Sequence, residues 1–200
     1  MSTLTQEQFS QIRDEIFRIS SNENNPTGAI NKLTSYIRKY SSSGDLYALR
    51  AVLHYDIQDG PLTISDTTTA FELGLLHFDI PEVRKALYYG RGLAYSNLGN
   101  SQNAISDASK AISVDPNYVN AYTMRGQAYA DIEQYQPAMT DFDKALSIDP
   151  KDGFAYECRA GVWAAWGQHA KAKADYRKAE SLGQRLHPEI KKYMRRGWFW

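Results

Sequence analysis

The chain is organised around a unit of 34 residues that follows itself without a gap. The unit is most complete from 119 to 152, and the same pattern returns one period earlier and one period later. Equivalent positions hold Tyr88, Tyr122 and Tyr156, then Ala104, Ala138 and Ala172, then Ala111, Ala145 and Ala179. A fixed period of this length is typical of folds in which small units stack and bury their apolar surface only against neighbours.

Each unit predicts a pair of helices. Apolar residues recur at helical spacing, a short break follows, and a second helical pattern completes the unit. In the central unit, Gly126 and Ala138 lack bulk where two helices approach, while Tyr122 and Phe142 fill the space between them. Pro150 follows the second pattern, and proline disfavours the helical conformation of the residue before it.

The repeats contain the runs RGLAYSNLG, AISDASKAISVDP and RGQAYADIEQYQPAMTDFDKALSIDP. These runs resemble the tetratricopeptide repeat family, and the resemblance extends over residues 85–186. It implies an all-α fold, a right-handed α-solenoid of stacked antiparallel helix pairs. It also implies a concave wall, lined by the first helix of each pair, that binds a protein or peptide.

The pattern divides the chain into six segments. We expect a degenerate N-terminal helical hairpin at 1–43, an interrupted repeat with an insertion at 44–84, complete repeats at 85–118, 119–152 and 153–186, and a C-terminal capping helix and tail at 187–200. Tyr47 and Tyr88 are 41 residues apart, seven more than one period. Because Gly60-Pro61 is a helix breaker, we place the insertion at 57–66, as a longer loop between two helices, and expect the next helix at 67–78.

The last segment carries an amphipathic pattern. Ile190, Tyr193 and Met194 share one helical face, so we expect a helix at 188–196 that covers the final seam of the array. Its alternative is a helix that docks on a partner or a membrane surface, an idea favoured by the aromatic end, 198–200. The same end could support formation of a homo-oligomer.

The amino-acid composition excludes several classes of protein. Lys and Arg total 23, as do Asp and Glu, and this balance argues against a nucleic-acid module, although RNA binding remains an option. The single cysteine excludes an internal disulfide and favours a reducing compartment. The first residues do not resemble a secretory signal, and no apolar run is long enough to span a membrane. We therefore expect a cytoplasmic protein without metal or cofactor.

One set of charges recurs with the repeat. Arginine and aspartate occur 16 residues apart in three units, as Arg91 with Asp107, Arg125 with Asp141, and Arg159 with Asp175. In a helical hairpin this separation brings the two side chains face to face, so we predict one internal ion pair per repeat. The alternative is a ladder of arginines that grips an acidic partner.

No catalytic group emerges. Cys158 and His169 are the thiol and imidazole closest in sequence, but Cys158 belongs to a predicted helix and His169 follows the turn after it. The helical rise of about 1.5 Å per residue separates them by roughly 13 Å. We therefore predict a non-catalytic protein.

The family resemblance places partner contacts on the first helices. The predicted partner-binding residues are Leu49, Val52, Tyr55, Tyr89, Leu93, Asn97, Met124, Gln127, Asp131, Phe154 and Glu157. Large apolar anchors, among them Met124, should dominate affinity, and we expect the fold to tolerate Met124→Glu. The carboxylate clamp of family members that act as heat-shock co-chaperones is not matched, because the corresponding places hold Ala48, Val52, Gly90, Asn120 and Met124.

Three functions fit this surface. The first is a protein-interaction module, as a chaperone or adaptor for one partner. The second is an immunity or inhibitor protein that occludes a toxin or enzyme, and the third is a self-associating structural protein.

Overall fold

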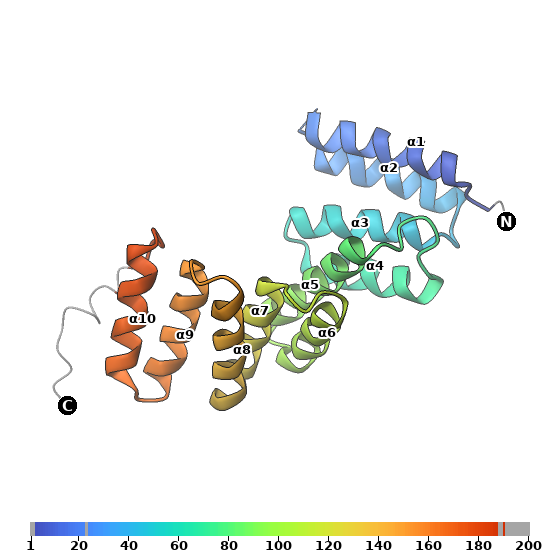
Figure 1. Ribbon diagram of the computed structural model, residues 1–200. Helices are drawn as coiled ribbons and strands as arrows, with labels where there is room; N and C mark the ends of the chain where they lie inside the picture. The colour runs from blue at the N-terminus through green and yellow to red at the C-terminus, as the bar shows by residue number, and fades with distance from the viewer. Residues whose placement is uncertain (1–2, 23, 188–189, 191–200) are drawn as a thin grey trace. The chain divides into compact units, whose positions relative to one another are not determined.

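The computed structural model describes residues 3–22, 24–187 and 190. Over this part of the chain the fold is all-α, built from adjacent packed pairs of antiparallel helices, as the repeat pattern predicts (Figure 1). The chain divides into two compact units, residues 1–115 and 116–200. The first unit carries α1 to α6 and the second carries α7 to α10.

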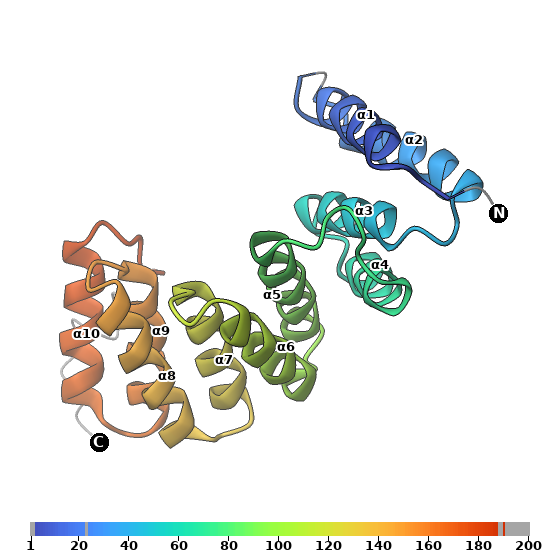
Figure 2. The same ribbon diagram turned by 45° about the vertical axis from the view of Figure 1, so that its right-hand side comes forward.

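The first unit begins with a hairpin of large apolar side chains. Helix α1 (Gln6–Phe17) continues through a single π-helical turn, η1 (Arg18–Asn22), and is followed by α2 (Pro26–Lys39). Thr5 caps α1 in a capping box with Gln8, and the Asn25 side chain caps α2, which has Pro26 in its first turn. The two helices lie side by side in both ribbon views (Figure 2). Phe9 and Leu33 are fully buried between them.

The second hairpin pairs α3 (Gly44–Asp56) with α4 (Gly60–Leu73), and it corrects the predicted insertion. Residues 60–66 are helical, and only 57–59 connect the two helices. The Asp59 side chain caps α4, and Pro61 lies in its first turn, where proline suits a helix start. This connection has one residue in the left-handed backbone conformation, as the connections in later pairs do. Here it is Gln58, with φ 60°, and in the next pair it is Gly99, with φ 75°. The connection between α3 and α4 therefore contains no extra residues.

The seven extra residues lie after α4: the loop 74–80 is three residues longer than the loops 115–118 and 149–152, and α5 (Pro81–Asn97) is four residues longer than the first helices of later pairs. The predicted helix at 67–78 is therefore wrong after Leu73, and Pro81 lies in the first turn of the next helix. Asp45, at the start of α3, holds this loop because its carboxylate accepts hydrogen bonds from the backbone N–H groups of Leu76, His77 and Phe78 at 2.9 to 3.1 Å. Gly44 is needed beside it, since a Cβ there would lie 2.2 Å from the carbonyl oxygen of Gly74.

The loop 74–80 also contacts the first hairpin. The Phe9 ring stacks on His77 with ring centres 5.7 Å apart, and it lies 5.5 Å from the Phe78 ring. His77 Nε2 is 3.0 Å from the carbonyl oxygen of Leu4. The loop 74–80 thus joins α1 to α3. Helix α6 (Ser101–Val114) pairs with α5 and completes the first unit.

The second unit contains α7 (Val119–Asp131), α8 (Tyr135–Ile148), α9 (Gly153–Ala165) and α10 (His169–Ser181). The close approach predicted at Gly126 is present, because a Cβ there would lie 3.0 Å from the ring of Phe142. The predicted capping helix at 188–196 lies outside the described residues except for Ile190. That residue packs against the cluster of Ala160, Tyr176 and Leu186.

Candidate protein-binding surface

The repeated arginines and aspartates form the predicted internal ion pairs. Each pair is bidentate, with Nε and Nη2 of the arginine donating to the two carboxylate oxygens of the aspartate. The Nε to oxygen distances are 2.7 Å for Arg91–Asp107, 2.8 Å for Arg125–Asp141 and 2.7 Å for Arg159–Asp175. Arg91 and Asp107 are the most enclosed of the three pairs, with side chains 10% and 3% exposed.

A fourth pair escaped the sequence analysis. Arg50 of α3 donates to Asp66 of α4 at 2.7 and 2.8 Å, again 16 residues apart. The sequence prediction missed this pair because it assigned residues 57–66, which include Asp66, to a loop. The spacing of 16 residues between arginine and aspartate would have been enough to predict it. The hydrogen bond to Asp66 raises the pKa of Arg50, which keeps the guanidinium charged.

The arginines also connect successive hairpins. The remaining nitrogen, Nη1, donates to the second helix of the preceding hairpin in three cases: Arg50 to Thr34 at 3.0 Å, Arg91 to Thr68 at 2.9 Å and Arg159 to Asp143 at 2.6 Å. Each of these guanidinium groups therefore ties three helices together. This structural use replaces the alternative in which the arginines grip an acidic partner.

Six of the predicted partner-binding residues belong to the first unit, on α3 and α5. Val52 and Asn97 are exposed, while Leu49, Tyr55, Tyr89 and Leu93 are half-buried. Tyr55, Leu93 and Asn97 come together at a hollow of about 330 Å³ between α3, the start of α4 and the end of α5. The ring of Tyr55 lies against the backbone of α5, where a Cβ at Gly90 would be 3.4 Å away.

The start of α4 supplies residues of this hollow that the sequence analysis missed. Gln58, Gly60 and Thr63 line it, together with Asp56 and Ala94. Three of these residues fall in the segment assigned to an insertion, so no pattern there indicated a binding role. Partial burial of its carboxyl group raises the pKa of Asp56, although the residue as a whole is exposed. The hollow thus combines an aromatic ring, an aliphatic side chain and a carboxylate.

The other five predicted residues lie on α7 and α9 of the second unit. Asp131 and Phe154 are exposed, and Gln127 and Glu157 are half-buried. Glu157 accepts a hydrogen bond from the side chain of Gln184 at 2.7 Å. Met124 is only 3% exposed, so it is not a surface anchor. The expectation that the fold tolerates Met124→Glu is wrong, because the new carboxylate would be buried without a partner.

The cysteine is not an activated nucleophile. Burial raises the pKa of the Cys158 thiol to about 12, so the thiol stays protonated at neutral pH. Among the described residues, no group of three or more His, Cys, Asp or Glu side chains has the arrangement of a metal site. In the same part of the chain, no helix combines the length and apolar character needed to cross a membrane.

The tetratricopeptide repeat profile matches the chain at residues 86–118 and 119–152. These two matches coincide with the helix pairs α5–α6 and α7–α8. Residues 86–152 therefore contain two tetratricopeptide repeats. No curated protein matches the sequence of this chain.

Solved structures share the fold over most of the chain. MamA residues 41 to the end, from Desulfovibrio magneticus RS-1, align with a TM-score of 0.76 and 16% identity, covering 90% of this chain and 97% of that one. Another MamA crystal structure gives 0.74 and 19%, covering 96% and 99%. YrrB, a tetratricopeptide repeat protein described as having an unusual peptide-binding site, gives 0.71 and 16%, covering 89% and 93%. At these identities the likeness concerns the fold alone.

Proposed function

We propose that this chain is a non-catalytic protein-interaction module that holds a segment of a partner protein against its first helices, as an adaptor or chaperone. The observation that carries the proposal is the hollow in the first unit, where the predicted residues Tyr55, Leu93 and Asn97 converge. A half-buried tyrosine and leucine offer an apolar anchor site, and the Asn97 amide can both donate to and accept from a peptide backbone. The peptide-binding site ascribed to YrrB supports the same use of this fold.

The charge at the rim suggests which segment would bind. Asp56 lines the hollow beside Tyr55, and its raised pKa reflects a carboxylate that has lost part of its hydration. If the bound segment has a lysine or arginine next to its apolar anchor, that cation would pair with the Asp56 carboxylate. We place the protein in the cytoplasm as part of this proposal, in keeping with its single, half-buried thiol.

Selection from a displayed peptide library on the full chain tests the proposal. Leu93→Asp should weaken the selected peptides by at least thirtyfold, because a charge replaces an anchor contact. Leu76→Asp is the matched control, since Leu76 is 74% exposed in the loop 74–80 and lies outside the hollow. Asp56→Asn should reduce both the affinity for the selected peptides and the dependence of that affinity on salt concentration. If the wild type and Leu93→Asp bind the selected peptides with equal affinity, the peptides do not bind in this hollow.

A further inference from the structure

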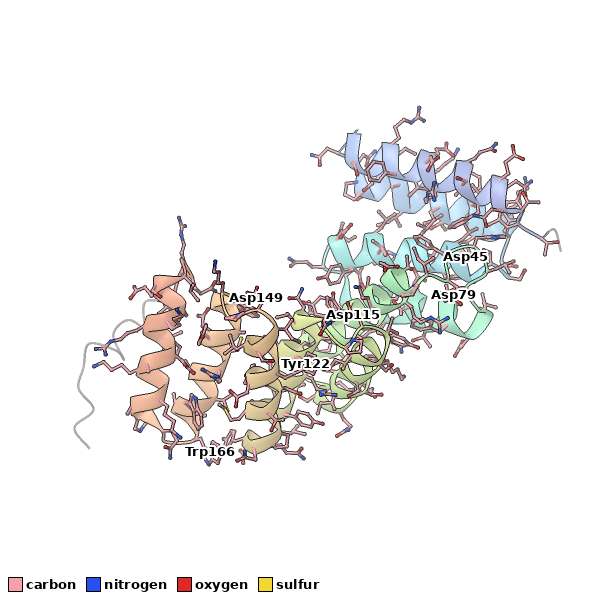
Figure 3. All side chains as sticks on the ribbon, in the orientation of Figure 1. Asp45, Asp79, Asp115, Tyr122, Asp149 and Trp166 are labelled. Carbon is pink, nitrogen blue, oxygen red and sulfur yellow. The ribbon has the colours of Figure 1, made fainter. Side chains whose placement is uncertain are left out.

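A second surface lies at one end of α8, α9 and α10. Trp163 and Trp166, in the last turn of α9 and just after it, stack with ring centres 5.7 Å apart and planes 6° from parallel. Tyr135, at the start of α8, lies 6.0 Å from Trp166. Trp166 is 40% exposed, and Figure 3 shows it at the opposite end of the helices from Asp149. We call these three residues the aromatic row.

The aromatic row borders a hollow of about 300 Å³. Trp163 and Trp166 form its wall, and Met139, which is 3% exposed, adds a buried thioether. Gln136 and Gln168 line it with side-chain amides on exposed residues. Ligand sites combine apolar walls with a few polar groups in this way, and this volume is at the small end of their range, about 300 to 1,000 Å³.

The charges around the hollow are balanced within the protein. Lys171 places its ammonium group 4.2 Å from the ring centre of Trp163, and Asp143 accepts a hydrogen bond from Arg159 at 2.6 Å. One cation and one anion among the lining residues therefore already have partners. A charged ligand would have to compete with these contacts, so the surface favours an uncharged occupant.

We propose that the aromatic row is a second docking site, which binds a proline-rich segment of a partner in the polyproline II conformation. Proline rings are apolar and uncharged, and they stack on exposed indoles. The polyproline II backbone has no internal hydrogen bonds, so its carbonyl groups can accept from the amides of Gln136 and Gln168. An amphipathic helix fits less well, since it needs a longer apolar groove for anchors at i, i+3, i+4 and i+7.

This site is independent of the hollow proposed for the first unit. Its residues belong to the second unit, and two of the three helices that carry them, α8 and α10, are the second members of their pairs. A protein with both sites could hold two segments of one partner, or one segment from each of two partners.

The test uses the full chain and a capped L-proline oligomer of about ten residues, which forms about three turns of the polyproline II helix. The D-proline oligomer is the matched control, because it has the same composition and the opposite handedness. Calorimetry should show the L-oligomer binding at least about tenfold more tightly than the D-oligomer. Equal binding of the two, or no binding of the L-oligomer, would overturn the proposal.

Variants locate the site. Trp166→Ala should weaken L-oligomer binding at least about tenfold, as expected for an aromatic anchor. Phe17→Ala removes an aromatic residue that is 66% exposed on α1, and it should leave the affinity unchanged. Gln136→Ala changes only an exposed amide and should weaken binding severalfold even if Trp166→Ala perturbs the fold. Equal losses in Phe17→Ala and Trp166→Ala would contradict the proposal.

Discussion

The first hairpin and the four that follow hold their helices together by different means. Between α1 and α2 the contacts are large apolar side chains, with Phe9 and Leu33 fully buried. The polar links include a hydrogen bond from Tyr36 to Glu15 at 2.6 Å and an ion pair of Lys32 with Glu15 at 3.3 Å. From α3 to α10, each hairpin buries several alanines and carries a bidentate Arg–Asp pair. Apolar packing tolerates small sliding of one helix along the other, whereas an enclosed ion pair requires one alignment.

This difference between ion pairs and apolar contacts also affects how successive hairpins pack against one another. A guanidinium group has donors left after it binds one carboxylate, and Arg50, Arg91 and Arg159 use them on the preceding hairpin. A buried aliphatic side chain has no such directional contact. The repeated arginine therefore sets the alignment both within a hairpin and between neighbours, which explains why it recurs at the repeat period.

The largest expected effect comes from breaking the most enclosed pair. Asp107→Ala leaves the Arg91 guanidinium, in a residue that is 8% exposed, without its carboxylate. Breaking a buried pair by removing one partner costs about 3 to 5 kcal/mol of unfolding free energy. Urea unfolding measures the loss. Asp14→Ala is the control, because Asp14 pairs with Arg13 on the surface and its removal should cost about 0 to 1 kcal/mol. Similar losses in the two variants would mean that the buried pairs contribute no more than surface pairs.

The first hairpin should show the reverse pattern. Leu33→Ala removes a fully buried side chain from α2 and should cost about 2 to 5 kcal/mol, including the cavity left behind. Glu15→Ala removes the charged partner of Tyr36 and Lys32 at a more exposed position and should cost about 1 kcal/mol or less. Hydrogen exchange of α1 and α2 reports the two losses locally. If Glu15→Ala proves the more damaging variant, the contrast between the two kinds of hairpin fails.

The loop 74–80 links the two kinds of hairpin, beside the hydrogen bond from Arg50 to Thr34, and Asp45 holds this loop. Asp45 is 1% exposed, and Asp45→Ala removes the acceptor for the N–H groups of Leu76, His77 and Phe78. Unsatisfied buried donors cost about 1 to 3 kcal/mol. Because Phe9 packs on His77 and Phe78, limited proteolysis should then cut the loop faster, and the first hairpin should lose these contacts. Unchanged protease resistance would show that apolar contacts alone hold the loop.

The regular hairpins were largely predictable from sequence, and the junction was not. The ion pairs follow from a spacing of 16 residues, because two helices of similar length joined by a tight turn bring those positions together. Gly60-Pro61 was misleading, since proline breaks the interior of a helix but suits its first turn. Extending the Arg–Asp spacing to Arg50 would have identified Asp66 and placed the extra residues after it, between α4 and the middle of α5.

The binding surfaces were predictable only in part. Helical periodicity identifies a face of each helix but does not show how far neighbouring helices cover it, and for this reason Met124 proved buried. The aromatic row was missed because Tyr135 and Trp166 come from different repeats and meet only through the packing of α8 against α9.

The smallest expected effect distinguishes one repeat hairpin from the others by its response to pH. His54 of α3 is 5% exposed and stands where later repeats have Tyr95, Tyr129 and Trp163. Burial lowers its pKa, even though Asp66 lies 3.5 Å from Nε2 and favours the charged form. Arg50 and Asp59 also act on it, in opposite directions.

The direction of this pH dependence is set by which state, folded or unfolded, binds the proton first. Well above about pH 6.5, the ordinary pKa of histidine, the imidazole is neutral in both the folded and the unfolded chain, so His54 adds no pH dependence there. As the pH falls below that value, the unfolded chain binds the proton first, and the free energy of unfolding decreases until the folded His54 also titrates. His54→Tyr, which copies the later repeats, removes this contribution. Between about pH 7 and pH 5.5, the urea midpoint of the wild type should therefore fall more than that of His54→Tyr. A smaller fall in the wild type would mean that the attraction of Asp66 outweighs burial at this position.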